Sequence, residues 1–300
     1  MKIVRRKSEL RNLTNTWHWA GDTIGVVLTM GALHDGHLSL VKAAHSRSDR
    51  VIVTIFVNPR QFNNPEDLAK YPKTEDSDAR ILGPLDIDVL YVPEPEEIYP
   101  SGFSTTISVS GVSDGLCGGD RPGHFDGVAT VVTKLLLQTD ADCTFFGEKD
   151  YQQLQVVRRV VADLDLKTEI VACPTVREND GLAMSSRNLR LGSEAREMAP
   201  VIGRVLESAA TEIGQGGNVA QALETARQTL LVTGFDAVDY CELRGEPDLQ
   251  PLVSADRPGR LFVAAWLDGV RLIDNTPVKA ADRAAGRCCT DQLQLRTRPT

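Results

Sequence analysis

Short runs of apolar, often β-branched residues alternate along the first part of the chain with segments whose apolar residues recur at helical spacing. The runs that predict strands lie at residues 23–28, 51–57, 89–92, 105–109, 143–146 and 169–173. The run at 51–57 is unbroken, which is typical of a parallel strand buried on both faces. The alternation predicts an α/β fold with a Rossmann-like, doubly wound parallel sheet.

The pattern changes beyond residue 190. Helices are predicted at residues 193–213 and 219–231, and short strands at 238–243, 260–266 and 270–273. This order indicates a second, smaller α+β C-terminal domain. The predicted boundaries are 1–183 for the first domain, 184–280 for the second and 281–300 for a mobile tail that lacks hydrophobic periodicity.

Composition narrows the class of protein. The chain has 300 residues, 42% of them hydrophobic and 25% charged, as in globular proteins, and no apolar run approaches the roughly 18 residues of a membrane span. The N-terminus lacks the apolar core of a signal peptide. The six cysteines show no C-x-x-C pair, so we expect reduced thiols and a cytoplasmic protein. The formal net charge of −8 argues against non-specific nucleic-acid binding but leaves an anionic small substrate open.

The stretch Thr29–His37 is the most informative part of the sequence. It lies between the apolar run at 23–28 and a helical pattern, so it predicts a strand, a loop with two glycines and a helix. At such a junction, unpaired first-turn N–H groups and the helix dipole favour a phosphate. Gly31 and Gly36 would let the backbone approach that phosphate closely.

His34 and His37 supply the candidate chemistry of this loop. If the helix starts at or just after Asp35, both imidazoles can donate to phosphate oxygens beyond its N-terminus. One alternative is a pair of ordinary surface-loop histidines. Another is a zinc pair, although zinc-binding histidines on a helix are better placed four apart and need further ligands. The strand before and the helix after the loop favour phosphate binding.

A second strand-to-helix junction follows the run at 143–146. Gly147 provides the turn, and Lys149 stands at the helix start, where it can bind phosphate. Asp150 can accept hydrogen bonds from ribose hydroxyls, and Gln153 lies one turn further along and can face the same crevice. The alternative is an ordinary charged helix N-terminus whose acidic residues suit the dipole.

Other polar side chains follow predicted strands. Asn58 and Gln61 come after the strand at 51–57 and fall on the same sheet edge as the histidine loop, because ligands collect at the carboxyl ends of parallel strands. Ser185, Ser186 and Arg187 follow the strand at 169–173 at a greater distance. Two hydroxyls and a guanidinium suit the oxygens of a triphosphate.

Two weaker indications remain. Arg121 and His124 could contact an anion, although no predicted strand end directly precedes them. The polar segment 63–78 is long for a connection, which often marks a lid or binding loop. Its carboxylates could hold a magnesium ion or form a solvated face, and they are Glu66, Asp67, Glu75, Asp76 and Asp78.

With these residues in place, the chain resembles the pantothenate synthetase (pantoate:beta-alanine ligase) family of the nucleotidylyltransferase superfamily with the H-x-G-H loop. The resemblance runs to about Ala280 and rests on six motifs: T-M-G-A-L-H-D-G-H at 29–37, I-F-V-N-P-x-Q-F at 55–62, R-P-G-H-F at 121–125, F-G-E-K-D at 146–150, D-G-L-A-M-S-S-R-N at 180–188 and L-I-D-N at 272–275. It implies that the carboxylate of pantoate attacks the α-phosphate of ATP and releases pyrophosphate. The amine of beta-alanine then attacks the pantoyl adenylate and releases AMP. Magnesium and a homodimer are also implied.

The resemblance further implies the site residues. Those that would contact ATP are Met30, Gly31, Ala32, Leu33, His34, Asp35, Gly36, His37, Gly147, Glu148, Lys149, Asp150, Val176, Met184, Ser185, Ser186 and Arg187. Gln61 and Gln153 would hold pantoate, with Asn58 at the same edge and Gln61 also near beta-alanine, and His37 would be the proton donor. The catalytic groups that would stabilise charge on the phosphates are His34, His37, Lys149, Ser185, Ser186 and Arg187. The second domain and the loop after Arg60 would exclude water from the acyl adenylate.

Three positions depart from the family pattern. Leu28 stands where proline is usual, and Cys117 where glutamate before glycine is usual. Arg60 occupies a position that is commonly methionine or threonine, and it would place an extra cation beside Gln61.

Two other functions compete with the ligase. A cytidylyltransferase-type enzyme is disfavoured by the neutral Gln61 and Gln153, because a phosphate acceptor needs a more basic site. A catalytically silent nucleotide-binding or regulatory subunit is disfavoured by the intact motifs.

Overall fold

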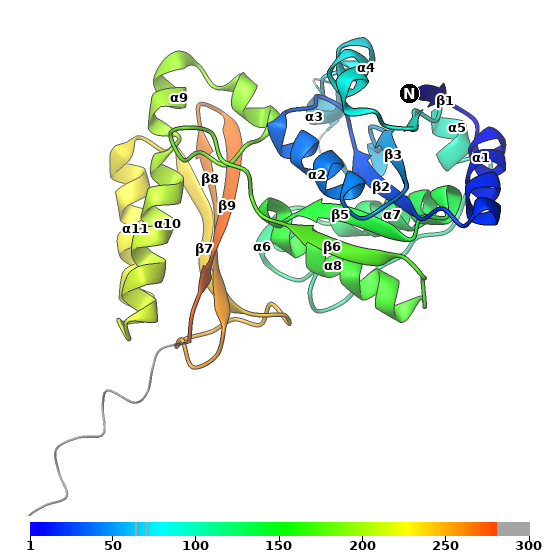
Figure 1. Ribbon diagram of the computed structural model, residues 1–300. Coiled ribbons are helices and arrows are strands. Elements are labelled where there is room, and N and C mark those ends of the chain that lie inside the picture. The colour runs from blue at the N-terminus through cyan, green and yellow to red at the C-terminus, as the bar shows by residue number, and fades with distance from the viewer. Residues whose placement is uncertain (64, 70, 281–300) are drawn as a thin grey trace, which may run out of the picture.

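Two β-sheets organise the chain in this computed structural model, which describes residues 1–63, 65–69 and 71–280 (Figure 1). The strands are β1 Lys2–Val4, β2 Ile24–Thr29, β3 Arg50–Ile55, β4 Val89–Tyr91, β5 Cys143–Gly147, β6 Glu169–Cys173, β7 Ala237–Gly245, β8 Gly259–Leu267 and β9 Val270–Val278. Six form a parallel sheet in the order β1-β4-β3-β2-β5-β6, and three form an antiparallel sheet in the order β7-β8-β9. The predicted α/β fold with a smaller C-terminal α+β part is confirmed.

Helices cover both faces of the parallel sheet. The α-helices are α1 Lys7–Ala20, α2 Asp35–His45, α3 Pro65–Ala69, α4 Glu75–Leu82, α5 Pro95–Ile98, α6 Leu116–Asp120, α7 His124–Thr139, α8 Tyr151–Asp163, α9 Ser193–Met198, α10 Val201–Gly214 and α11 Val219–Thr233; the short 3₁₀ helices are η1 Pro59–Gln61, η2 Gly83–Leu85, η3 Glu148–Asp150 and η4 Ser186–Arg190. Helices α1, α7 and α8 pack in one core cluster through residues such as Leu10 and Leu154, and α2 and α4 pack in another through Leu40 and Leu82. Burial on both faces explains why the central strands are unbroken apolar runs.

The chain order along the parallel sheet reverses between β2 and β5. From β2 the chain continues outward through β3 and β4, whereas β5 and β6 lie on the other side of β2. Strands β2 and β5 pair directly, Gly25 with Cys143 and Val26 with Thr144. In doubly wound sheets, ligands bind at the carboxyl ends of the strands beside such a reversal. The fold therefore brings the two predicted phosphate loops together.

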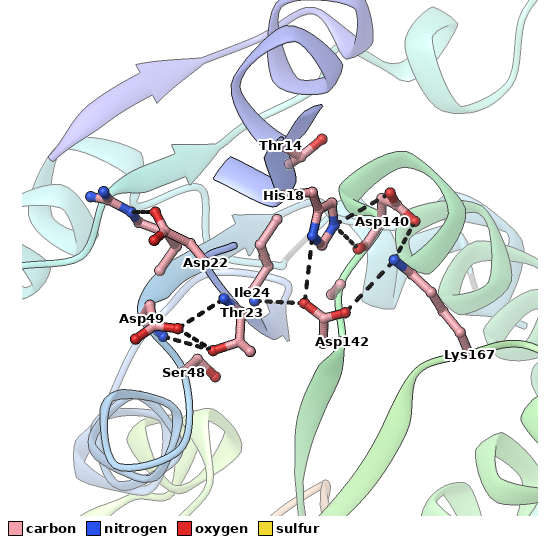
Figure 2. A network of polar contacts seen from close by, with 12 residues as sticks. Thr14, His18, Asp22, Thr23, Ile24, Ser48, Asp49, Asp140, Asp142 and Lys167 are labelled. Atoms are coloured by element: carbon pink, nitrogen blue, oxygen red, sulfur yellow. Dashed lines mark hydrogen bonds and ion pairs between the residues drawn. The ribbon is translucent and has the colours of Figure 1, made fainter. Parts of the chain in front are cut away.

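A polar network joins β2 and β5 to α1 at the opposite end of these strands (Figure 2). The Ile24 N–H donates to the Asp142 carboxylate (2.8 Å), and His18 Nε2 lies 3.0 Å from the Asp140 carbonyl oxygen. Lys167 Nζ lies 2.9 Å from the Asp140 carboxylate. These contacts fix the pair of strands from the end that carries no predicted ligand residue.

The second sheet is backed by α10 and α11, which lie on its side away from the parallel sheet (Figure 1). Its core is a separate cluster that includes Leu206, Leu230 and Leu261. One helix was expected at 193–213, but Pro200, which has no N–H to continue a helix, separates α9 from α10. The domain boundary at residue 183 stays a prediction, and the predicted tail at 281–300 lies outside the described residues.

The strand predicted at 105–109 is wrong. The N–H of Ile107 donates to Thr130 Oγ1 of α7 (3.0 Å) instead of to a neighbouring strand, and residues 105–109 have no regular structure. Ile107 and Val109 pack against the main core, so the apolar alternation reflects packing on a helix.

The described cysteines and helices bear on two further expectations. Cys117, Cys143, Cys173 and Cys241 are free thiols, as predicted, while Cys288 and Cys289 lie outside the described residues. None of the helices in the described ranges combines the length and the apolar character that crossing a bilayer demands.

A truncation in α8 tests the core. Leu154 is fully buried, so Leu154→Ala should lower the free energy of unfolding by about 2–5 kcal/mol through lost burial and a residual cavity. Leu164, at the end of the same helix, is 47% exposed, and Leu164→Ala should change that free energy by no more than about 0.5 kcal/mol. Urea unfolding measures both, and equal losses would contradict the packing of α8.

Candidate active site

A buried carboxylate of α4 shapes the loop between β2 and α2. Asp78, only 1% exposed, accepts hydrogen bonds from the N–H groups of Ala32 (3.0 Å) and Leu33 (2.9 Å). Thr74 Oγ1 accepts from the same Ala32 N–H (2.9 Å). Gly31, with a φ of 84°, makes the turn that directs these N–H groups to Asp78. The conformation of the histidine loop is therefore set from a distant part of the chain.

This arrangement corrects two expectations. The Gly31 N–H donates to Thr29 Oγ1 (3.2 Å), so the N–H groups of residues 31–33 are already bonded within the protein, and only Gly36 of the two loop glycines lines a cavity. Asp78 was a candidate magnesium ligand, but both of its oxygens bind the loop. Of the same acidic group, Glu75 pairs with Arg5.

His34 and His37 form a coupled pair at the start of α2. The Gly36 N–H donates to His34 Nδ1 (3.1 Å), the His34 N–H lies 3.4 Å from His37 Nδ1, and the ring centroids are 4.1 Å apart. Because each Nδ1 accepts a hydrogen bond, the neutral rings carry their proton on Nε2 and keep one donor each for a ligand. Helix α2 begins at Asp35, which is the condition under which both imidazoles were expected to reach beyond its N-terminus.

Burial keeps both imidazoles neutral near pH 7. It lowers the pKa of His37 to about 3, with the neighbouring His34 as a second cause. Burial also lowers the pKa of His34, and the charge of Lys149 lowers it further. An anion beside these rings would act in the opposite direction, because a negative charge favours the imidazolium form.

Lys149 lies in η3 at the carboxyl end of β5, just before α8 begins at Tyr151. Its ammonium group is largely enclosed, with 15% of the side chain exposed, and Nζ is 3.9 Å from the Asp150 carboxylate. Gln153 follows in the first turn of α8. The chain thus places a cation, a carboxylate and an amide on the strand end next to the histidine loop.

The serine-rich segment reaches the same place by way of a hairpin. The Met184 N–H donates to the Val176 carbonyl oxygen (2.9 Å), which aligns the two sides of the hairpin. Ser185 then caps η4, since its Oγ accepts from the Arg187 N–H (3.3 Å).

These segments surround a cavity of about 260 Å³. The predicted site residues that line it are Met30, His34, Gly36, His37, Asn58, Gln61, Gly147, Lys149, Asp150, Gln153, Val176, Met184, Ser185, Ser186 and Arg187. A second cavity of about 640 Å³ extends to the antiparallel sheet, and residues common to both include Lys149, Asp150, Gln153 and Arg187. The predicted residues that line neither cavity are Gly31, Ala32, Leu33, Asp35 and Glu148.

The Gln61 side chain is held by neutral partners. Asn58 Nδ2 donates to Gln61 Oε1 (3.0 Å), and Gln61 Nε2 lies 2.9 Å from the Met30 sulfur. Asn58 is nearly fully buried, and it also donates to the Gly127 carbonyl oxygen (3.0 Å) and accepts from the Tyr99 hydroxyl (2.7 Å). These contacts make Asn58 a support for Gln61, and its direct contact with a substrate stays a prediction.

Arg121 and His124 lie at the same wall, and both line the two cavities. Burial, helped by Arg121, lowers the pKa of His124 to about 4. His124 Nδ1 is 2.7 Å from the Gln61 carbonyl oxygen, and Arg121 Nη2 donates to the same oxygen (3.2 Å). Arg121 and His124 were candidates for contact with an anion. In the structure, their side chains hold the Gln61 carbonyl oxygen.

The departures from the family pattern have separate explanations. The Arg60 guanidinium lies over the rings of Tyr99 and Phe103 (5.0 and 4.8 Å to the centroids) and does not line the cavity, so the extra cation expected beside the Gln61 side chain is absent. Leu28 lines the cavity. Cys117 Sγ lies 3.1 Å from the Tyr240 hydroxyl, where the two parts of the chain meet.

The apolar wall of the cavity was not foreseen as part of the site. It consists of Leu28, Leu40, Phe56, Phe62, Phe146, Val128, Val131, Val132 and Leu135. The helical spacing at 128–136 predicted a buried helix face, but nothing in that spacing distinguishes residues that touch core from residues that touch a ligand.

The described residues contain no group of three or more His, Cys, Asp or Glu side chains that could hold a metal ion. The zinc interpretation of His34 and His37 therefore lacks its further ligands in that part of the chain. Asp150 is the carboxylate that lines both cavities beside Lys149.

Comparison with known proteins gives a single answer along almost the whole chain. Residues 2–277 match the model of the family described as pantoate-beta-alanine ligase. The pantothenate synthetase of Chelativorans sp. is 62% identical over 276 residues, which cover 92% of this chain and 97% of that protein. The pantothenate synthetase of Roseobacter denitrificans is 60% identical over 279 residues, which cover 93% and 98%.

Solved structures agree with the sequence comparison. A crystal structure of pantothenate synthetase from Thermus thermophilus superimposes with a TM-score of 0.87 at 42% identity, covering 93% of this chain and all of that one. A pantoate-beta-alanine ligase from Francisella tularensis, solved as a complex with beta-gamma ATP and beta-alanine, gives a TM-score of 0.79 at 39% identity and covers 92% and 97%.

The buried His37 should make stability depend on pH. The ring stays neutral in the folded protein down to about pH 3, whereas in the unfolded chain it binds a proton below about pH 6.5, so stability is lost as the pH falls below 6.5. Between pH 6 and 5, His37→Asn should flatten the pH dependence of the free energy of unfolding by about 1.4 kcal/mol per pH unit.

Urea unfolding at several pH values measures that slope. Ser39→Ala removes a hydroxyl from the same helix that donates to the Gly36 carbonyl oxygen (2.8 Å), so it provides a control that carries no titrating group. It should shift the curve and keep its slope. A parental slope in His37→Asn would show that His37 is not the group kept neutral by folding.

Proposed function

The chain belongs to the pantoate-beta-alanine ligase family, and we propose that the cavity at the carboxyl ends of β2 and β5 is where it carries out its reaction. The protein condenses (R)-pantoate with beta-alanine at the expense of ATP, through a pantoyl adenylate, and releases AMP and pyrophosphate. One observation carries the choice of site: His34, His37 and Lys149, from two adjacent strand ends, line the same cavity as Gln61 and Gln153.

In the first step a pantoate carboxylate oxygen attacks the α-phosphorus of ATP. The new bond joins that oxygen to phosphorus, and the bond from the α-phosphorus to the bridging oxygen breaks and releases pyrophosphate. Such a displacement needs charge stabilisation more than a protein nucleophile. We assign that role to Lys149, Arg187, the Ser185 and Ser186 hydroxyls and the Nε2–H groups of His34 and His37, with Arg121 as a neighbouring cation.

Pantoate is proposed to bind between Gln61 and Gln153 against the apolar wall, which suits its branched carbon skeleton. Amide groups fix the carboxylate through hydrogen bonds without a strong ion pair, so its oxygen stays nucleophilic. In the second step the beta-alanine nitrogen attacks the acyl carbon, the bond from that carbon to the AMP oxygen breaks, and the nitrogen loses its proton. The AMP phosphate, which gains a negative charge when that bond breaks, takes up this proton.

His37 acquires its proposed role as proton donor only with a ligand in place. In the ligand-free protein its pKa of about 3 leaves the ring neutral at pH 7. The charge of a bound triphosphate, or of departing pyrophosphate, raises that pKa and lets the ring take up a proton. Before that, His37 acts as a neutral hydrogen-bond donor.

Magnesium enters this proposal with the nucleotide. The ion is usually held by one or two carboxylates together with substrate phosphates, and Asp150 on the cavity wall fits that pattern as a single protein ligand. Bound there, it would neutralise phosphate charge.

A homodimer and a cytoplasmic location complete the proposal. The homodimer rests on the family resemblance, and the location is supported by the free thiols and by the use of ATP.

The second sheet is proposed to act as a cover. The larger cavity extends from Lys149 and Arg187 to side chains of β7, β8 and β9, so residues 184–280 can exclude water from the acyl adenylate. Residues 71–78 are proposed as a second cover, because Tyr71 lines the smaller cavity. We set the cytidylyltransferase alternative aside, because the chain belongs to the pantoate-beta-alanine ligase family.

Substitution at the two strand ends tests the site. With ATP, pantoate, beta-alanine and magnesium, the protein should form AMP and pyrophosphate, and Lys149→Ala or His37→Ala should lower kcat about 100- to 1,000-fold, as the loss of an oxyanion donor does. Lys167, whose Nζ pairs with Asp140 at the other end of the sheet, provides the control, and Lys167→Ala should keep parental activity.

Production of AMP, followed with a coupled assay, measures all three variants. Rates of Lys149→Ala and His37→Ala within a few-fold of the parent would remove those residues from the site. Stabilisation by ATP in a thermal-shift measurement without any turnover would point instead to a silent nucleotide-binding subunit.

A further inference from the structure

The motif L-I-D-N at 272–275 lies in β9 of the antiparallel sheet, outside the segments that carry the predicted ATP contacts. Its last two residues, Asp274 and Asn275, are polar and nonetheless buried, with 2% and 5% of their surfaces exposed. Buried polar side chains need hydrogen-bond partners, so the partners indicate what these residues do.

The Asn275 amide contacts the backbone peptide groups on both sides of Lys149. Its Nδ2 donates to the carbonyl oxygens of Glu148 (3.0 Å) and Lys149 (2.9 Å), which belong to η3 at the end of β5. Its Oδ1 accepts from Arg260 Nη1 of β8 (2.6 Å). The amide therefore links the second sheet to the residue that carries the ammonium group in the cavity.

Asp274 reaches the other phosphate-binding segment. Its carboxylate forms a bidentate pair with Arg177 (2.7 and 3.0 Å), and Arg177 Nη1 also donates to the Gly181 carbonyl oxygen (3.0 Å). Arg177 pairs across the hairpin with Ala183, directly before the segment of Ser185 and Arg187. A bidentate pair of this kind fixes direction as well as distance.

Adjacent residues of one strand therefore hold two separate parts of the site. Side chains next to each other in a strand point to opposite faces, so neither segment can move relative to β9 without breaking one set of contacts. Strand β9 is itself held by the β8 ladder along its whole length, from Val278 with Gly259 to Val270 with Leu267. It provides a rigid spacer between Lys149 and the η4 segment.

We propose that Asp274 and Asn275 are positioning residues, which set the distance between Lys149 and the Ser185–Arg187 segment and so shape the triphosphate site from the second sheet. This inference rests on the proposed phosphate roles of Lys149 and Arg187. Loss of the Asn275 donor leaves two enclosed carbonyl groups without that partner and lets η3 shift. A displacement of about 1 Å at a reacting centre can cost about 100-fold in rate.

Two variants separate the functions of the Asn275 amide. Asn275→Ala removes the donor and the acceptor, whereas Asn275→Asp keeps the size and an oxygen that faces Arg260 but cannot donate to the two carbonyl groups. Both should lower kcat about tenfold or more, and by a larger factor than they change KM for ATP, because the interaction is needed in the transition state. Parental kcat in Asn275→Asp would show that only the contact with Arg260 matters, which overturns the proposal.

The matched control is another asparagine in the C-terminal part of the chain. Asn218 caps α11 by accepting from the Gln221 N–H (3.0 Å) and lines neither cavity. Asn218→Ala should lower the melting temperature and leave kcat unchanged. If Asn218→Ala lowered kcat as much as Asn275→Ala does at a similar loss of stability, the effect of Asn275 would be structural.

A double-mutant cycle with Lys149→Ala gives the decisive result. If Asn275 acts by placing Lys149, its substitution should change kcat by less than about threefold once the ammonium group is gone. A full, additive loss in the Lys149→Ala background overturns the proposal, and so does loss of cooperative folding in both Asn275 variants, which would make Asn275 a folding residue. If Lys149→Ala alone kept parental activity, the proposed phosphate role of Lys149 would fail instead.

Discussion

The pairing of β2 with β5 is the constraint on which the site depends. These strands are far apart in the sequence, yet their parallel register, Gly25 with Cys143 and Val26 with Thr144, makes their carboxyl ends neighbours. Because the chain order reverses there, no crossover helix fills the space beyond the two ends, and a crevice remains. Apart from the neighbouring Arg121, which lies between α6 and α7, the groups assigned to the phosphates reach that crevice either from these strand ends or from the hairpin after β6.

Short sequence patterns were sufficient to predict those site residues that stand directly beside a strand end in the chain. An apolar run, a glycine turn and a helical pattern predict where β2 and β5 end, and so place His34, His37 and Lys149. Contacts between distant segments could not be predicted in this way. Asp78 takes up the N–H groups of the loop, Arg60 lies on aromatic rings, and Ile107 bonds to a helix, and each outcome depends on a partner that spacing does not identify.

Burial determines the protonation state of His34 and His37, which the residue type alone does not reveal. Charge costs free energy in an enclosed site, so His37 and His34 are neutral until an anion compensates for that cost. The cluster around the cavity is consequently less positive in the empty protein than its composition indicates. The site can present donors to a triphosphate while attracting few of the chain's own carboxylates, which matters in a protein with a net charge of −8.

Hydrogen bonds between neutral groups fix the positions of Gln61 and Lys149, and the proposed reaction explains why neutral groups suit these places. Tyr99, Asn58 and Gln61 form a chain in which each group orients the next, and Asn275 holds the peptide that carries Lys149. An ion pair in these places would be stronger, but it would also lower the nucleophilicity of a carboxylate or draw Lys149 away from the phosphates. Amides and hydroxyls fix positions without competing for charge. We therefore attribute the positions of the Gln61 side chain and of the Lys149 backbone to neutral polar groups. Charged groups that bond within the protein, such as Asp78 and the Asp274–Arg177 pair, fix segments behind the cavity. The cations that face the cavity are left to stabilise phosphate charge.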